Sequence, residues 1–432
     1  MAKKLKILVI GSGGREHAVV WKISRSKKVK KIYTAPGNPG TAKLAENIGI
    51  DASDINGLIK FAKEKKIDLT FVGPEGPLID GIVDKFTANK LAIIGPSKKA
   101  AAIEGSKIFA KKMISKYGIP TAKFQVFTDY KKAVFYVQSQ KYPLVLKADG
   151  QCFGKGVKVA KNKEEAQDFL EKLLVQKIFG QSGNKVIIEE YLEGPEISFM
   201  LATDGDNFVS LIPSQDHKRV FDKDTGPNTG GMGAFAPLPF VGKKLIKRIE
   251  KEIVIPALMA MKKEGYPYKG ILYPGLILTS QGPKVLEFNC RFGDPETQSV
   301  LSLLKTDIID LFQAIIKGKI DKLKLSWHTG YAVCVVLSAD GYPGKYQKGQ
   351  QIRGLEKIKN AFVFHSGTKE SVNKIVASGG RVLGIAARGN SLKNAIKNAY
   401  KSIGKNGIHF SGMHYRKDIG QKGLNKKLWK MN

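Results

Sequence analysis

A short apolar run that ends in a glycine turn constrains the fold of this chain more than any other feature. Residues 6–10 are almost wholly apolar, the run ends in Gly11-Ser12-Gly13-Gly14, and a helix-like segment follows at 15–26. A strand, a glycine turn and a helix in this order open a βαβ unit. Between turns rich in Gly and Pro, strand-like runs follow at 31–35, 69–72 and 91–94, with a helical pattern at 55–65. We therefore predict an α/β, Rossmann-like domain with a parallel sheet over residues 1–100.

The sequence pattern after residue 100 predicts further layers of helices and strands, followed by a mostly β C-terminal part. Ser97 is placed to cap a helix that runs on to Gly118. Residues 121–190 read as a small α+β lid, a larger layer extends to 325, and a separate, mostly β module occupies 326–432. The expected strands are 124–127, 144–147, 157–160, 186–190, 271–278, 284–288, 333–337, 361–364 and 384–387. The expected helices are 164–175, 245–261 and 299–316.

Composition indicates a large globular protein. Of the 432 residues 42% are hydrophobic, enough for substantial cores. The apolar runs fall short of the ~20 residues that span a bilayer, and the first is too short for a signal peptide. Cys152, Cys290 and Cys334 are odd in number and widely spaced, which favours reduced thiols. We expect a cytoplasmic monomer without a membrane partner.

The formal charge of +34 raises nucleic-acid binding as an alternative. However, 63 of the 72 cationic residues are Lys and only nine are Arg, although phosphate clamps and base readers favour Arg. No helix-turn-helix, RNP or zinc-finger spacing is visible. We therefore expect no nucleic-acid partner, and a gel shift at physiological salt would test this.

The glycine turn at Gly13 and Gly14 is a candidate phosphate site. Backbone N–H groups at a strand end and the start of a helix both attract anions. A dinucleotide site is disfavoured, because Glu16 stands where the fingerprint needs Gly. The alternative is a plain tight turn.

A second glycine-containing loop joins Lys147 at a strand end to Gly154-Lys155-Gly156. Two lysines around a flexible turn suit a flap over nucleotide phosphates. The Gly-Lys pair lacks the Ser or Thr of a Walker A loop, and an ordinary hairpin is the alternative.

An acidic turn follows the next expected strand and contains Glu189, Tyr191 and Glu196. One carboxylate is a candidate for an adenine amino group and another for ribose hydroxyls. The alternative is a solvated turn, as most charge-rich turns are.

The most specific motif runs from Glu287 to Gln298. On a strand, Glu287, Asn289 and Arg291 project to one face, while Phe288, Cys290 and Phe292 pack on the other. A carboxylate and an amide oxygen suit Mg²⁺ when phosphates and water complete its shell. The adjacent guanidinium suits a transferring phosphoryl group. A cross-strand salt bridge is the alternative.

The stretch from Gln215 to Gly233 mixes Asp216 and Asn228 with many glycines, including Gly230. So many glycines and polar groups predict a loop rather than a core, and one dense in donors for an anionic substrate. A flexible linker is the alternative.

Taken in order, these motifs resemble the phosphoribosylamine–glycine ligase family of the ATP-grasp superfamily. The resemblance extends from residues 11–17 and 36–40, through 72–75 and 104–107, to 415–420. It implies a Rossmann-like domain, an ATP-grasp domain of lid and platform over 101–325, and a C-terminal domain that closes the amine-substrate site. The implied reaction joins glycine to 5-phosphoribosylamine through glycyl phosphate, with ATP as cosubstrate.

The resemblance also implies residue roles. It places Mg²⁺ or Mn²⁺ on Glu287 and Asn289, and chemistry at Arg291, Asp216 and Asn228. The implied ATP contacts are Lys147, Gly154, Lys155, Gly156, Glu189, Tyr191 and Glu196. The implied substrate contacts are Gly13, Gly14, Arg15, Asn38, Glu75, Gly230 and Asp294.

Some residues depart from the family pattern, and two other functions stay open. The bulky Gln151-Cys152-Phe153 precedes the lid Gly-Lys-Gly, and Phe221, Lys223 and Pro274 replace smaller or different residues. Another ATP-grasp ligase, such as a purine-pathway carboxylase or a biotin carboxylase, is the rival of the same fold. A catalytically inactive scaffold is the other.

Overall fold

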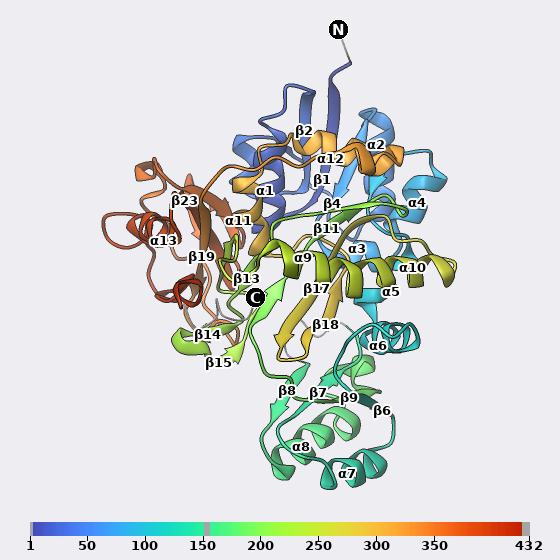
Figure 1. Cartoon of the computed structure of the whole chain (residues 1–432). Helices are drawn as coiled ribbons and strands as arrows, with labels where there is room; N and C mark the ends of the chain where they lie inside the picture. The colour runs from blue at the N-terminus through green and yellow to red at the C-terminus, as the bar shows by residue number, and fades with distance from the viewer. Residues whose placement is uncertain (1–2, 151–155, 426–432) are drawn as a thin grey trace.

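A computed structural model describes residues 3–150 and 156–425. Figure 1 shows the N-terminal sheet at the top, a central platform, a small lobe below it, and the C-terminal sheet at the left. Among the described residues, no helix has the length and apolar character needed to cross a membrane.

The N-terminal part is a five-stranded sheet in the order β3-β2-β1-β4-β5, and its pairs are parallel. Its strands are β1 (Leu5–Gly11), β2 (Val29–Pro36), β3 (Glu46–Asn47), β4 (Leu69–Val72) and β5 (Ile93–Ile94). Helices α1 (Gly14–Ile23), α2 (Ile55–Glu64), α3 (Glu75–Ile79) and α4 (Ile82–Ala88) connect them. The apolar residues 7–10 of β1 are fully buried, as a central parallel strand requires. The predicted parallel sheet is confirmed.

The single helix expected from Ser97 to Gly118 is wrong, because the chain forms two helices there. α5 (Lys98–Gly105) ends at Ser106, whose backbone is extended, and α6 (Lys107–Lys116) begins directly after it. The Ser106 hydroxyl caps α6 by accepting the Phe109 N–H at 3.1 Å. It also donates to the Asp149 carboxylate, which accepts the Ile108 N–H at 3.1 Å. A new cap thus interrupts one helix and starts another.

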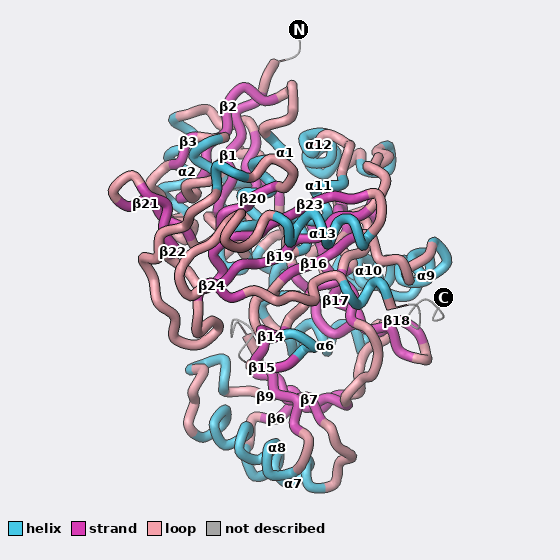
Figure 2. The backbone as a smooth tube through the Cα atoms, turned by 90° about the vertical axis from the view of Figure 1, so that its left-hand side faces the viewer, coloured by secondary structure: helices cyan, strands magenta, loops and turns pink. Residues whose placement is uncertain are grey.

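The lid is a four-stranded antiparallel sheet in the order β6-β9-β7-β8, and all four expected strands are present. It contains β6 (Phe124–Phe127), α7 (Tyr130–Gln138), β7 (Leu144–Ala148), β8 (Val157–Ala160), α8 (Lys163–Leu170) and β9 (Val186–Glu190). The expected helix 164–175 continues beyond α8 as a π-turn over Glu171–Val175. The lid has its own apolar core, and Figure 2 shows it as a distinct lobe at the bottom.

The platform sheet has the order β10-β17-β11-β12, and β18 pairs with β17. Its strands are β10 (Glu196–Ser198), β11 (Leu201–Thr203), β12 (Phe208–Ser210), β17 (Gly270–Thr279) and β18 (Gly282–Asn289). The helix expected at 245–261 is α9 (Lys243–Ile249) and α10 (Ile255–Lys263), joined by a π-turn. The single helix expected at 299–316 is wrong, because the chain forms two helices there. α11 (Glu296–Leu303) ends at Leu304, whose backbone is extended, and Asp307 caps α12 (Ile308–Lys317).

The C-terminal sheet is not the self-contained module expected after residue 326. Its order is β13-β16-β19-β23-β20, and β24 also pairs with β19. β13 (Gln215–Asp216) and β16 (Gly233–Ala236) come from the middle of the chain. They join β19 (Tyr331–Ala339), β20 (Phe362–His365), β23 (Arg381–Gly389) and β24 (Met413–His414), which α13 (Leu392–Lys401) covers. The boundaries at 100 and 325 stay predictions.

The glycine-rich stretch expected to be a loop also contains a hairpin of β14 (Arg219–Phe221) and β15 (Thr225–Asn228). A second hairpin, β21 (Thr368–Ser371) and β22 (Lys374–Ala377), projects from the C-terminal part in Figure 2. Cys290 and Cys334 are buried free thiols, while Cys152 lies outside the described residues.

Candidate functional site

The lid meets the platform at a buried cluster of two lysines and one carboxylate. Lys147 on β7 and Lys111 on α6 place their Nζ atoms 3.0 and 3.1 Å from Glu189 Oε2 on β9. Burial lowers the pKa of Lys111 to about 8, although the Glu189 charge opposes that shift. Lys147 also reaches across to the Leu286 carbonyl of β18 at 3.4 Å. The cluster therefore sets cationic groups where the two sheets face each other.

The same cluster leaves one buried oxygen without a partner. Glu189 is only 2% exposed, and its Oε1 atom has no hydrogen bond within the described part of the chain. An unpaired buried carboxylate oxygen is costly, and a ligand N–H would satisfy it. This feature fits the predicted adenine contact.

The other predicted ATP contacts lie around this cluster or outside the described residues. Gly156 is buried, and its carbonyl accepts the Ala148 N–H at 2.8 Å. Tyr191 follows β9 and is exposed. Gly154 and Lys155 lie in the segment 151–155, outside the described residues.

Strand β18 shows the predicted alternation of faces. Phe288, Cys290 and Phe292 are buried on one side, while Glu287 and Asn289 are half-buried on the other.

Lys218 lies beside the acidic end of this face. Its Nζ lies 3.6 Å from Glu287 Oε1 and 2.9 Å from Glu196 Oε2 on β10. The Lys218 charge lowers the pKa of Glu287, although burial opposes the shift, so this carboxylate stays ionised at neutral pH.

The donors on β18 fit a divalent cation that a ligand helps to hold. No group of three or more His, Cys, Asp or Glu side chains within residues 3–150 and 156–425 is arranged to bind a metal ion. Glu287 and Asn289 supply two oxygen donors, which suits an ion that keeps water and phosphate ligands. Lys147 and Lys218 lie nearby and would attract the negative charge of a phosphate.

Arg291 lies between two carboxylates rather than facing an open pocket. Its Nε donates to Glu75 Oε2 at 2.9 Å, and its Nη2 lies 3.0 Å from Glu104 Oε1. Burial raises the pKa of Glu104, whereas Arg291 and Arg15 hold the pKa of Glu75 at about 2 against the effect of burial. Glu104 also accepts the Cys290 N–H at 2.6 Å. The two acids thus fix the orientation of the guanidinium.

The glycine turn after β1 is partly filled by its own helix. Glu16 Oε2 accepts the Gly13 N–H at 2.6 Å, and Glu16 Oε1 lies 2.6 Å from Arg15 Nε. A Cβ on Gly14 would lie 2.7 Å from Gln298 Nε2, so the turn packs closely against α11. Any phosphate at this turn would depend on groups other than the Gly13 N–H.

Asn38 holds loops of two different sheets together. Its amide nitrogen donates to the carbonyls of Ser12 at 2.7 Å and His365 at 3.0 Å. Its amide oxygen accepts the N–H groups of Gly40 and Thr41. With both ends of the amide engaged, its role as a substrate contact stays a prediction.

Asp294 lies beside the glycine turn, and Arg381 connects it to Gly230. Arg381 of β23 donates to the Asp294 carbonyl at 2.7 Å and to the Gly230 carbonyl. Arg381 and Arg15 lower the pKa of Asp294, although burial opposes the shift. The Asp294 carboxylate also accepts Gln298 Nε2 at 2.7 Å.

Asp216 on β13 faces a second buried acid. Burial and the charge of Glu296 raise the pKa of Asp216 well above its usual range. Glu296 Oε1 accepts the hydroxyls of Tyr273 at 2.6 Å and Ser198 at 2.9 Å. Asn228 ends β15, opposite Arg219, and is half-buried.

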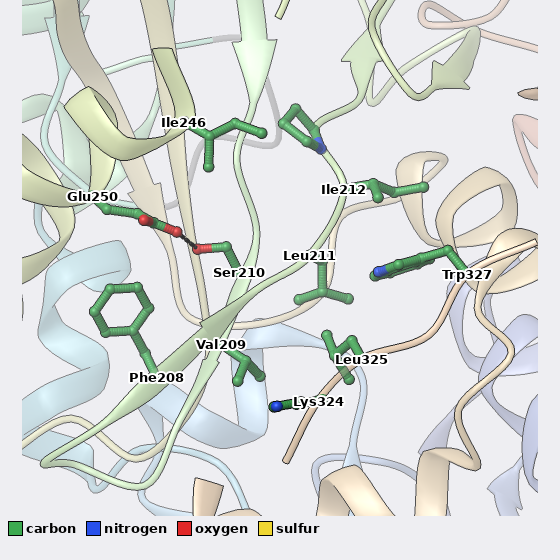
Figure 3. A pocket seen from close by; sticks show the side chains of 11 residues that line it. Phe208, Val209, Ser210, Leu211, Ile212, Ile246, Glu250, Lys324, Leu325 and Trp327 are labelled. Atoms are coloured by element: carbon green, nitrogen blue, oxygen red, sulfur yellow. Dashed lines mark hydrogen bonds between the residues drawn. The ribbon is translucent and has the colours of Figure 1, made fainter. Parts of the chain in front are cut away.

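A separate cavity of about 590 Å³ lies beside β12 and α9, as Figure 3 shows. Its wall is mainly apolar and includes Leu211, Ile212 and Trp327. Two polar residues in the wall form a hydrogen bond: the Ser210 hydroxyl donates to Glu250 Oε1 at 2.7 Å. None of the predicted site residues lines it, so we place the candidate site between the lid, β18 and the glycine turn.

Four residues of this site were missed as candidates: Lys111, Glu104, Lys218 and Arg381. One of them carried a readable signal. Lys111 lies three residues from both Ile108 and Ile114, on the buried face of its helix, and a lysine on an apolar face is unusual.

Models of one family match three consecutive parts of the chain. The N domain of phosphoribosylglycinamide synthetase matches residues 5–104, its ATP-grasp (A) domain 105–297 and its C domain 332–422.

Similar proteins agree with these matches. A phosphoribosylamine–glycine ligase of Caldanaerobacter subterraneus subsp. tengcongensis is 52% identical over 415 residues, covering 96% of this chain and 99% of that protein. The crystal structure of phosphoribosylamine–glycine ligase from Thermotoga maritima matches with a TM-score of 0.84 and 33% identity, covering 96% of this chain and all of that one. A biotin carboxylase domain from Hydrogenobacter thermophilus, with a TM-score of 0.73 and 18% identity over 100% of this chain and 96% of that one, shares the fold alone.

Proposed function

This chain belongs to the phosphoribosylglycinamide synthetase family, and we propose that its described side chains carry out that family's ligation of glycine to 5-phosphoribosylamine. The enzyme forms a carbon–nitrogen bond with ATP as cosubstrate, giving glycinamide ribonucleotide, ADP and phosphate in purine biosynthesis. The biotin carboxylases share the architecture at identities too low to indicate a common reaction.

The observation that supports the site most strongly is the meeting of lid and platform at β18. Lys147 contacts both Glu189 in the lid and the Leu286 carbonyl next to Glu287. ATP placed here would offer its adenine amino group to Glu189 Oε1 and its phosphates to Lys147 and Lys155. Glu196 would take the ribose hydroxyls.

Glu287 and Asn289 would hold the divalent ion. We propose Mg²⁺ or Mn²⁺, which when bound screens the charge of the phosphates. The Lys218 charge that lowers the pKa of Glu287 keeps this donor ionised.

The reaction then takes two steps. A glycine carboxylate oxygen attacks the γ-phosphorus of ATP, the bond to the bridging oxygen breaks, and ADP leaves. The amine of phosphoribosylamine next attacks the carbonyl carbon of glycyl phosphate, expelling phosphate and losing a proton. Arg291, oriented by Glu75 and Glu104, would stabilise the acyl phosphate.

Asp216 is the proposed acceptor of that proton. A general base works best when its pKa lies near the operating pH, and burial beside Glu296 raises the pKa of Asp216 in that direction. Asn228 and the Gly230 loop would line the glycine and amine pockets. Gly14, Arg15 and Asp294 would border the sugar phosphate.

Omitting one substrate at a time tests this function. Phosphate release should require ATP, glycine and phosphoribosylamine together, and glycinamide ribonucleotide should form in equal amount. Phosphate release that bicarbonate supports in place of glycine would instead indicate a carboxylase.

The partners that this reaction needs are small molecules. We propose that the chain acts as a cytoplasmic monomer, without nucleic-acid or membrane partners. The mass in solution, measured by light scattering during size-exclusion chromatography, tests the monomer.

A further inference from the structure

One arginine of the C-terminal sheet joins two loops from elsewhere in the chain. Arg381 begins β23, and its guanidinium donates to the Gly230 carbonyl and to the Asp294 carbonyl at 2.7 Å. Its Nη2 also lies 3.2 Å from Asp294 Oδ2. With its side chain 22% exposed, Arg381 lies between the two loops rather than on the open surface.

The Gly230 peptide is held at both of its polar atoms. Its carbonyl accepts from Arg381, and its N–H donates to the hydroxyl of Tyr342 at 3.0 Å. A Cβ on Gly230 would lie 3.0 Å from Arg381 Cζ, so the backbone packs closely on the guanidinium. Both holding side chains come from the C-terminal part, whereas Gly230 precedes β16.

The Asp294 loop, in turn, borders the glycine turn after β1. A Cβ on Gly14 would lie 3.6 Å from Asp294 Oδ1, and Gln298 donates to that same oxygen at 2.7 Å. Arg381 therefore spans the space between the two regions assigned above to the sugar phosphate and the amine.

We propose that Arg381 is a positioning residue for the sugar-amine substrate: it sets the separation of the Gly230 and Asp294 loops that border its pocket. The proposal rests on the proposed function. Nη1 donates to both carbonyls while Nη2 reaches Asp294 Oδ2, and the single nitrogen of a lysine cannot keep all three contacts in this geometry. The proposed ATP contacts lie on the lid and β18, and the hydrogen bonds of Arg381 go to Gly230 and Asp294 instead, so we expect the affinity for ATP to be independent of Arg381.

Steady-state kinetics of Arg381→Met and Arg381→Lys test the proposal, with phosphoribosylamine and ATP varied in turn. We expect the KM for phosphoribosylamine to rise about tenfold in Arg381→Met, the effect of losing one or two charge-assisted hydrogen bonds. Arg381→Lys should recover part of this, and the KM for ATP should stay within about twofold in both. Arg388→Met, an exposed arginine at the far end of the same strand, is the matched control and should match the wild type.

An unchanged KM for phosphoribosylamine would overturn the proposal, and so would a parallel rise in the KM for ATP or a fall in kcat alone. If Arg381→Met does not fold, as circular dichroism would show, Tyr342→Phe replaces it. This variant should raise the same KM about threefold, because it removes one neutral hydrogen bond to Gly230, and an unchanged KM overturns the proposal. Failure of the proposed function is distinguishable, since wild-type ADP release would then not depend on glycine.

Discussion

Replacing Arg416 by methionine should reveal how the C-terminal segment holds the hairpin of β14 and β15. Arg416 is completely buried. Its Nε and Nη2 each lie 2.7 Å from an oxygen of Asp418, and its Nη1 donates to Asp224 Oδ1 at 2.9 Å and to the Arg219 carbonyl at 3.0 Å. One side chain thus connects the hairpin to the segment that follows β24.

The cost of the substitution follows from what remains unpaired. Removing one partner of a buried ion pair costs about 3–5 kcal/mol, because the other charge stays buried. Here Asp418 is 25% exposed and Asp224 39% exposed, so water reaches both carboxylates and the cost lies near the lower end of that range. We expect Arg416→Met to lower the free energy of unfolding by about 3 kcal/mol.

Urea unfolding followed by circular dichroism measures this difference. The matched control is Arg248→Met, which breaks an exposed pair with Glu252 one helical turn away and an exposed hydrogen bond to the Gln281 carbonyl. That change should cost about 0.5 kcal/mol. If Arg416→Met lowers the free energy of unfolding by less than about 1 kcal/mol, or by no more than the control, Arg416 does not form a stabilising buried ion pair.

Three further predictions concern pH and the ATP site. Burial lowers the pKa of His17 and of His217 to about 3 and that of His365 to about 4, while the unfolded chain takes up these protons near pH 6.5. The contribution of these three histidines to the free energy of unfolding should therefore be complete above pH 6.5 and fall by up to about 4 kcal/mol per pH unit between pH 6 and 4, as urea titrations would show; a flat profile would contradict it. Glu189→Gln should raise the KM for ATP about tenfold, because its one oxygen would accept from the two lysines and its NH2 group would face the adenine amino group, and an unchanged KM would remove the adenine role. Glu287→Ala should abolish ADP release and leave the circular dichroism spectrum unchanged, while Glu250→Ala, outside the site, should keep full activity; turnover by Glu287→Ala would exclude it as the metal donor.

Local pattern was enough to predict the strand that carries the proposed metal donors. Period-two alternation over Glu287 to Phe292 predicts which side chains share a face, and the observed burial agrees. The break before α6 was readable as well, because Gly105-Ser106 combines a helix-ending glycine with a helix-capping serine. The apolar run through this segment outweighed that signal.

Contacts between distant segments could not be predicted in this way. Arg291 has clear local chemistry, but its partners Glu75 and Glu104 lie on α3 and α5. Nothing near either glutamate in sequence marks it as the partner of an arginine. Such pairs arise only when the N-terminal sheet packs against the platform.

The C-terminal sheet shows most clearly why the sequence alone could not predict which segments form the candidate site. A division into consecutive domains assumes that each sheet is built from one stretch of chain, yet β13 pairs with β16, and β16 pairs with β19 from the C-terminal part. Backbone hydrogen bonds between strands leave no mark on residue type, so a two-residue strand such as Gln215–Asp216 has no signature of its partner. Asp216 lies where the C-terminal sheet meets the platform, because Ser214 next to β13 pairs with Ser198 of β10, and Gly230 lies just before β16. The Gly230 loop, which we propose as a substrate contact, can therefore be held by side chains from either part, as Arg381 on β23 holds it.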